Sequence, residues 1–146
     1  GIDYADALNA ATIWNGNIGK AIESLKDGML SKIAEITGNI CTALVADKEY
    51  DLLKACSVFE NDRDMLITSL TMMKSVLRDS LMYNKNADML SGQEDIVRLL
   101  ASRLSRDKTV KLIDACDRVR ILAEKNGNRP ILITKLCYEL RRAQCR

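Results

Sequence analysis

The chain has 146 residues, 47% hydrophobic and 29% charged, which is typical of a soluble globular protein with one main domain. It contains no histidine, which excludes Ser-His and Cys-His nucleophile pairs and most zinc sites. The net charge of +2 conceals an uneven distribution: residues 1–97 carry 9 Lys/Arg and 15 Asp/Glu, whereas residues 98–146 carry 13 and 5. Such asymmetry indicates subunit docking, nucleic-acid contact or simply solvated helix faces.

The cysteines and the chain ends point to a cytosolic fragment of a longer protein. Five cysteines, an odd number, lie far apart and form no C-x-x-C pair, so we expect reduced and mostly buried thiols. They are Cys41, Cys56, Cys116, Cys137 and Cys145. The first residue is Gly1 rather than Met, which suggests a cut from a larger parent. No apolar run approaches the ~20 residues of a membrane span.

Helical periodicity runs through almost the whole chain and strand-like alternation is missing, so we predict an all-α bundle of about seven or eight helices without a sheet. The first two helices are expected at about 3–14 and 18–25, with Asn15-Gly16 as the corner between them. A third is expected at about 29–46, although Thr37-Gly38-Asn39 would weaken, bend or split it.

The fourth and fifth helices follow two further cap signals. Asp47 is the predicted N-cap of a helix that turns four apolar residues inward: Leu52, Leu53, Cys56 and Phe59. Cap residues around Asp62 precede the longest helix, at about 63–84. This helix carries two apolar stripes, one of Leu66, Leu70, Met73, Leu77 and Leu81 and one of Met65, Met72, Val76 and Tyr83. Two stripes predict burial between neighbours, and hence a central helix.

Three more helices complete the chain. Ser91 to Glu94 fits a capping box, and Ser105 is the expected cap of the next helix. Pro130 suits the first turn of the last helix, which ends near Arg141-Arg142. The residues expected to face inward are Ile96, Val97, Leu99, Leu100, Leu112, Ile113, Cys116, Val119, Ala123, Leu132, Ile133, Leu136, Cys137 and Leu140.

The glycine-rich stretch 15–20 (NGNIGK) raises the question of a phosphate site, because turns of this kind before helices often bind anions. A Walker loop needs a preceding strand, the spacing G-x-x-x-x-G-K and a hydroxyl after the lysine. Here a helix precedes, the glycines are three apart and Ala21 follows Lys20. The motif therefore predicts a corner between two helices and no nucleotide site.

No other pattern predicts chemistry. The acidic pairs Asp62/Asp64 and Glu94/Asp95 lie at expected helix starts, where negative charge is stabilising, and no metal-ligand spacing occurs. We therefore expect no catalytic, cofactor-binding or metal-binding residues.

The basic residues beyond position 98 suit two interpretations. Acidic residues at 107, 114, 117 and 124 are interleaved with them, and no aromatic residues for base stacking accompany them. This mixture favours ion pairs along a helix surface. Direct contact with DNA phosphates stays open as an alternative.

Two stretches resemble a known family. Residues 10–25 (AATIWNGNIGKAIESL) are similar to the end of the lid region in bacterial clamp-loader subunits, where a helix, a Gly-Ser or Gly-Asn corner and an A-L-x-x-L pattern recur. Residues 126–136 (NGNRPILITKL) are similar to the start of the last helix in delta-prime subunits of DNA polymerase III, with Thr134 where an acidic residue is usual. The order and spacing of both stretches resemble the C-terminal part of that subunit, over nearly the whole chain.

The resemblance implies that residues 1–28 are the last two helices of an incomplete AAA+ lid domain and residues 29–146 a helical collar for oligomerisation. In this family five collars pack into a ring, while ATPase domains open the sliding clamp around primed DNA during replication. The implied fragment is cytoplasmic and has neither catalysis nor cofactor of its own, although its parent belongs to a DNA polymerase with a clamp-loader ATPase. The implied partners are the gamma/tau and delta subunits, with the clamp and DNA reached only through the complex and no membrane. The interface is expected within about 105–142.

One position separates the members of the family. The ATP-binding subunits resemble G-S-x-R-D-A-L at the corner, and that arginine reaches the nucleotide. The corresponding position here is Gly19, which cannot reach a γ-phosphate and therefore fits delta-prime better. Two alternatives stay open, namely the collar of a gamma/tau-type ATPase subunit and an unrelated helical DNA-binding or regulatory module.

The incomplete lid predicts a further property. Without its earlier helices, apolar residues such as Trp14 and Ile18 would lack part of their packing. We therefore expect the chain to self-associate or to fold this hairpin onto the collar.

Overall fold

The computed structural model describes residues 28–46, 49–60, 62–83, 93–125 and 128–145. These ranges hold six α-helices, one 3-10 turn (η1) and no strand, which confirms the all-α prediction. The elements are α3 (Met29–Val45), α4 (Glu49–Cys56), η1 (Ser57–Phe59), α5 (Arg63–Met82), α6 (Glu94–Arg103), α7 (Arg106–Glu124) and α8 (Arg129–Cys145). They correspond to the third to eighth expected helices. The helices expected at 3–14 and 18–25 lie outside the described residues.

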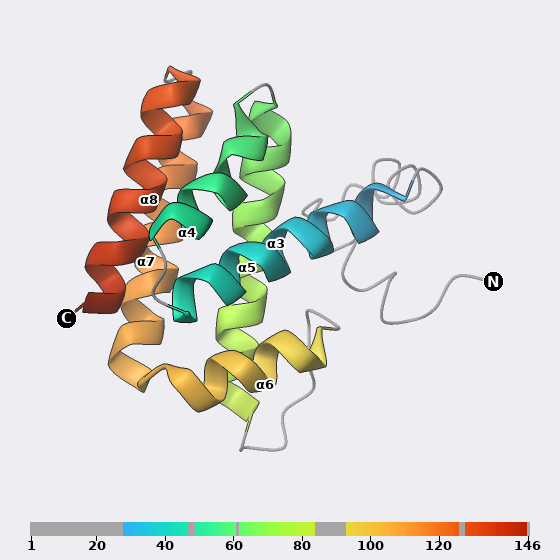
Figure 1. Ribbon diagram of the computed structural model, residues 1–146, viewed down its shortest axis with the longest axis vertical. Coiled ribbons are helices and arrows are strands. Elements are labelled where there is room, and N and C mark those ends of the chain that lie inside the picture. Colours follow the sequence, from blue (N-terminus) through green and yellow to red (C-terminus); the bar gives the residue numbers. More distant parts are fainter. Residues whose placement is uncertain (1–27, 47–48, 61, 84–92, 126–127, 146) are drawn as a thin grey trace.

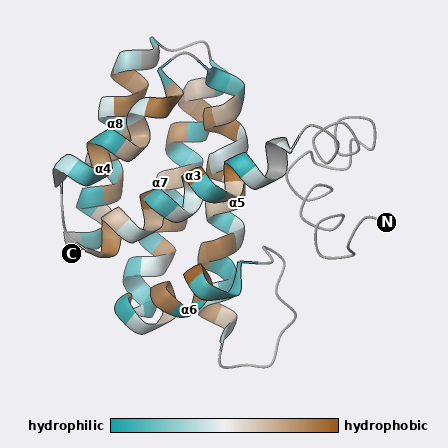
Figure 2. Cartoon of the chain, turned by 45° about the vertical axis from the view of Figure 1, so that its right-hand side comes forward, coloured by the Kyte–Doolittle hydropathy of each residue, from teal (hydrophilic) through white to brown (hydrophobic). Residues whose placement is uncertain are grey.

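The helices form a bundle built around α5, α7 and α8 (Figure 1). Helix α5 packs on α7, and α7 packs on α8. Helix α3 crosses over α5, and α4 lies between α3 and α8. Helix α6 runs across the foot of the bundle, against α5 and α3. The hydropathy colours alternate along each helix, as expected for amphipathic segments that cover one another (Figure 2).

Helix α5 is the central helix, as its two apolar stripes predicted. Leu70 and Leu77 of one stripe and Met72 and Val76 of the other are all at most 2% exposed. The helix begins where Asp62 caps it, with the Met65 N–H donating to Asp62 Oδ1 at 2.9 Å. Because the two stripes lie about 120° apart around α5, more than one neighbouring helix is needed to cover them.

The predicted local signals for α7 and α8 are confirmed. The Lys108 N–H donates to Ser105 Oγ at 3.2 Å, so Ser105 is the N-cap of α7. Pro130 lies in the first turn of α8, where its missing N–H has no helical partner to lose. The inward sides of both helices meet in the core, where Leu112, Val119 and Leu140 are fully buried.

Helix α3 passes through Thr37-Gly38-Asn39 without a break, so the glycine does not split it. The physical reason is the crossing of α6. A Cβ placed on Gly38 would lie 3.5 Å from Ile96 Cδ1, so the Ile96 side chain packs directly over the glycine. The packing gained at this crossing offsets the poor helix propensity of Gly38.

Three sequence expectations are corrected by the structure. Leu53, expected to face inward with Leu52, is 50% exposed, because it lies on the side of α4 that neither α3 nor α8 covers. Helix α6 has Gln93 at its N-cap instead of Ser91, and the Gln93 side chain makes no capping hydrogen bond. Helix α8 continues past Arg142 to Cys145.

No helix within the described ranges is both long enough and apolar enough to cross a membrane.

We predict that Phe59→Ala lowers the free energy of unfolding by about 3–5 kcal/mol, because it leaves a cavity where a fully buried ring joins η1 to the core. The matched control is the neighbouring Val58, which is 48% exposed. Val58→Ala should change the free energy of unfolding by less than about 0.5 kcal/mol. Urea unfolding followed by circular dichroism measures both. Equal losses in the two variants would contradict the assigned packing.

Substitutions at Gly38 should separate propensity from packing. Gly38→Ala should stabilise the chain by about 0.5–1 kcal/mol, because the added Cβ makes an ordinary contact with Ile96 and favours the helix. Gly38→Leu should destabilise it, because the larger side chain pushes α6 away from α3. Thermal unfolding of both variants measures the difference, and a stabilising leucine would show that α6 does not cross here.

Candidate subunit interface

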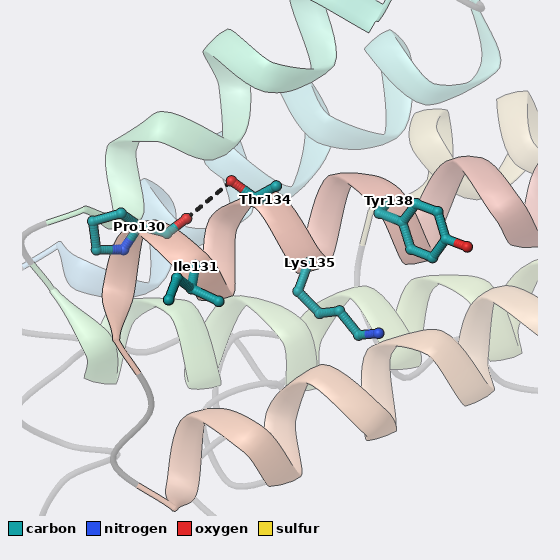
Figure 3. A pocket seen from close by; sticks show the side chains of 5 residues that line it. All are labelled: Pro130, Ile131, Thr134, Lys135 and Tyr138. Carbon is teal, nitrogen blue, oxygen red and sulfur yellow. Dashed lines mark hydrogen bonds between the residues drawn. The ribbon is translucent and has the colours of Figure 1, made fainter.

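The outward side of α8 carries an open apolar surface. Pro130, Ile131, Thr134, Lys135 and Tyr138 line a shallow hollow of about 500 Å³ along one side of the helix (Figure 3). Ile131 is 67% exposed and Tyr138 is 58% exposed, although both are large apolar side chains. The Thr134 hydroxyl donates to the Pro130 carbonyl at 3.1 Å, so it is satisfied within the helix. A partner protein that binds here would therefore bury mainly apolar surface and would desolvate few polar groups.

Lys135 borders this surface and is held in place on two sides. Its ammonium Nζ lies 3.1 Å from Glu139 Oε1 and 5.6 Å from the centre of the Tyr138 ring. The ion pair and the cation–π contact limit the side chain to the edge of the hollow. Lys135 extends from α8 toward α7 (Figure 3).

Glu139 joins α8 to α7 beneath the surface. Its side chain is only 3% exposed, and Arg118 of α7 donates to its Oε2 from both Nε at 3.1 Å and Nη2 at 2.8 Å. Burial raises the pKa of Glu139, but the hydrogen bonds from Arg118 and Lys135 outweigh this effect, so the pKa lies below its usual value. The carboxylate thus fixes how α8 is rotated on α7, and so which residues α8 turns outward.

A second carboxylate joins α7 to the central helix. Lys74 Nζ of α5 lies 2.6 Å from Asp117 Oδ1, and Arg120 Nη2 lies 3.4 Å from the same oxygen. Partial burial raises the pKa of Asp117, but the hydrogen bonds from these two cations bring it below its usual value. Helix α7 is therefore anchored by charge on both neighbours.

Much of the positive charge of α7 is neutralised on the helix itself. Lys111 lies 3.0 Å from Asp107, and Arg120 lies 2.9 Å from Glu124 as well as near Asp117. This is the arrangement of local ion pairs that the interleaved sequence favoured. Because of these ion pairs, α7 offers less positive charge to the phosphates of DNA than its number of Lys and Arg residues suggests.

The four cysteines that the structure describes are free thiols, as expected. Cys41, Cys56 and Cys116 are buried, and Cys137 is half-buried. Burial raises the pKa of Cys41 to about 12, which makes this thiol unreactive. A hydrogen bond with Cys137, and then burial, raise the pKa of Cys56, while the same hydrogen bond lowers that of Cys137.

The remaining motifs of the sequence lie at helix ends or outside the described residues. The corner at Gly16–Lys20 is among the residues that the structure does not describe. Asp62 and Asp64 lie at the start of α5, and Glu94 and Asp95 lie in the first turn of α6. In the described part of the chain, no three His, Cys, Asp or Glu side chains gather closely enough to hold a metal ion.

Sequence reasoning missed the features that shape this surface. Arg118 and Glu139 are 21 positions apart, so no helical spacing pairs them. Lys135 and Glu139 do stand four apart, a signal for an ion pair, but this spacing does not reveal that the carboxylate is buried. The expected interface at 105–142 named no contact residues, and it also spans residues buried in the core.

We predict that Glu139→Gln lowers the free energy of unfolding by about 1–3 kcal/mol at pH 7, because Arg118 and Lys135 lose their shared carboxylate. The folded pKa of Glu139 is lowered, so its stabilisation is complete above the ordinary glutamate pKa of about 4.3 and is lost as the pH falls through the folded value. The deficit of the variant should therefore vanish in acid. Denaturant titrations over a pH series measure this.

The matched control is Glu124→Gln. Glu124 also pairs with an arginine of α7, but its side chain is 48% exposed, so the change should cost less than about 1 kcal/mol at any pH. A deficit in Glu139→Gln that persists unchanged at low pH would show that the charge is not what holds α8.

A comparison with known protein families identifies a match. The family described as DNA polymerase III, delta subunit, C terminal, matches residues 35–142, which run from within α3 to near the end of α8. Searches of curated proteins and of solved structures give no match. The matched range covers most of the chain and nearly all of the described bundle. The chain therefore belongs to the family formed by the C-terminal domains of DNA polymerase III delta subunits, which places it among the clamp-loader proteins.

Proposed function

We propose that this chain is the C-terminal oligomerisation (collar) domain of a delta-prime subunit, a structural part of the clamp loader in DNA replication. In this proposal the domain does no chemistry. It binds the gamma/tau and delta subunits, and it reaches the sliding clamp and DNA only through the assembled complex in the cytoplasm. Residues 1–28 are the end of the preceding lid domain.

The family match over residues 35–142 is the observation that carries the clamp-loader role. The all-α bundle and the exposed apolar side of α8 support assembly as the task of the domain. The choice of delta-prime is supported by Gly19, which stands where the motor subunits have an arginine that reaches ATP. The similarity of residues 126–136 to the start of the last delta-prime helix supports the same choice.

The delta subunit is a second candidate, because the matching family is named for delta. Both candidates predict an assembly domain, and they differ in the position within the ring that the domain fills.

A competition experiment tests the proposal and separates the two candidates. The chain is titrated into a clamp loader reconstituted from the purified subunits of the same organism, and the complexes are resolved by size-exclusion chromatography. We expect the chain to displace delta-prime and to remain bound to gamma/tau. Displacement of delta would assign the chain to delta, and displacement of no subunit would refute the assembly function.

A further inference from the structure

The bundle exposes a second apolar surface besides that of α8. We define the α8 face as Ile131, Thr134 and Tyr138, and the α4 face as Tyr50, Leu53 and Val58. Tyr50 is 75% exposed, Leu53 50% and Val58 48%, so the α4 face is as open as the α8 face. Each face combines an aromatic ring with aliphatic side chains, the composition of a buried interface core.

The two faces differ in the sign of the charge around them. Beside the α8 face, Lys135 and the exposed Arg142 are cationic, whereas the Glu139 carboxylate of the same helix is buried against Arg118 and Lys135. Next to the α4 face the balance reverses, since the exposed Asp51 and Glu60 outnumber Lys54. One face is therefore apolar with a positive border, and the other is apolar with a negative border.

We propose that the α8 face of one chain docks on the α4 face of a second copy, in a head-to-tail contact. Each face buries the other's exposed aromatic and aliphatic side chains, and the opposite borders attract. Like faces would instead bring like charges together, so α8-to-α8 and α4-to-α4 pairing are disfavoured. The pairing goes beyond the proposed assembly with sister subunits and does not depend on the delta-prime assignment.

The apolar side chains of the α8 face favour a protein over nucleic acid as its occupant. The large exposed side chains of the face are Ile131 and Tyr138, whereas a duplex requires a row of cations facing its phosphates. Because one contact surface is not the same as the other, the contact is heterologous, the type that builds rings or open chains.

The first test measures self-association of the chain by sedimentation velocity over a concentration series. The mass of the wild type should rise with concentration and fall again at high salt, because screening weakens the charged borders. Leu53→Asp and Tyr138→Asp should each weaken association about tenfold or more, since each places a charge in the middle of one face. Ile121→Asp is the matched control. Ile121 is 44% exposed on α7 and belongs to neither face, so its substitution should have no effect.

The decisive test mixes the two interface variants. The Leu53→Asp chain retains an intact α8 face, and the Tyr138→Asp chain retains an intact α4 face. Each variant alone should stay monomeric, whereas an equimolar mixture should form a 1:1 dimer that grows no further. Two copies of Leu53→Asp or of Tyr138→Asp cannot make this contact, so the mixture identifies which faces meet.

Three outcomes would overturn the proposal. A mixture that stays monomeric would show that α8 does not dock on α4. A wild type that remains monomeric at every concentration would also show that the two faces do not dock. If Tyr138→Asp in addition lowered the thermal stability of that monomer, another part of the chain would be covering the α8 face. If Tyr138→Asp instead lost only its ability to displace a subunit in the competition experiment, the face would serve a sister subunit, and the assembly function would stand without self-association.

Discussion

The bundle depends on the burial of α5 on both of its sides. Leu70 and Leu77 on one stripe and Met72 and Val76 on the other are almost completely buried, so no single neighbouring helix can cover them. Helix α7 packs on α5, and α3 and α6 complete the cover. Burial of this much apolar surface is the main source of stability. Helices α3, α6 and α7 therefore lie where they cover the apolar stripes of α5.

Two carboxylates, one half-buried and one buried, then fix α7 and α8 on this core. Asp117 holds α7 to Lys74 of α5, and Glu139 holds α8 to Arg118 of α7. Each carboxylate has two cationic partners, which compensates for its loss of hydration. These pairs use cations that would otherwise face solvent, so the basic third of the chain has a structural role. The positive charge left over borders the outward side of α8.

A bundle with a fixed interior and open apolar sides is suited to assembly. The interior holds α8 in one rotation, so the same residues always face outward, and a partner meets a preformed surface. The membership of the clamp-loader family agrees with the proposed assembly role. The apolar side chains that α4 and α8 expose are the surfaces available for such contacts.

The sequence by itself determined the six helices that the structure describes, because their signals are local. Asp62 and Ser105 cap the helices that follow them, and the two apolar stripes of α5 predicted a central position. Only the tertiary structure decided which apolar residues stay outside. Leu52 is buried and Leu53 exposed on the same helix, because coverage depends on where α3 and α8 lie. Arg118 pairs with Glu139 only when distant segments of the chain pack together, and this pairing sets which side of α8 faces outward. The local sequence pattern does not predict it, because it does not specify which segments become neighbours in space.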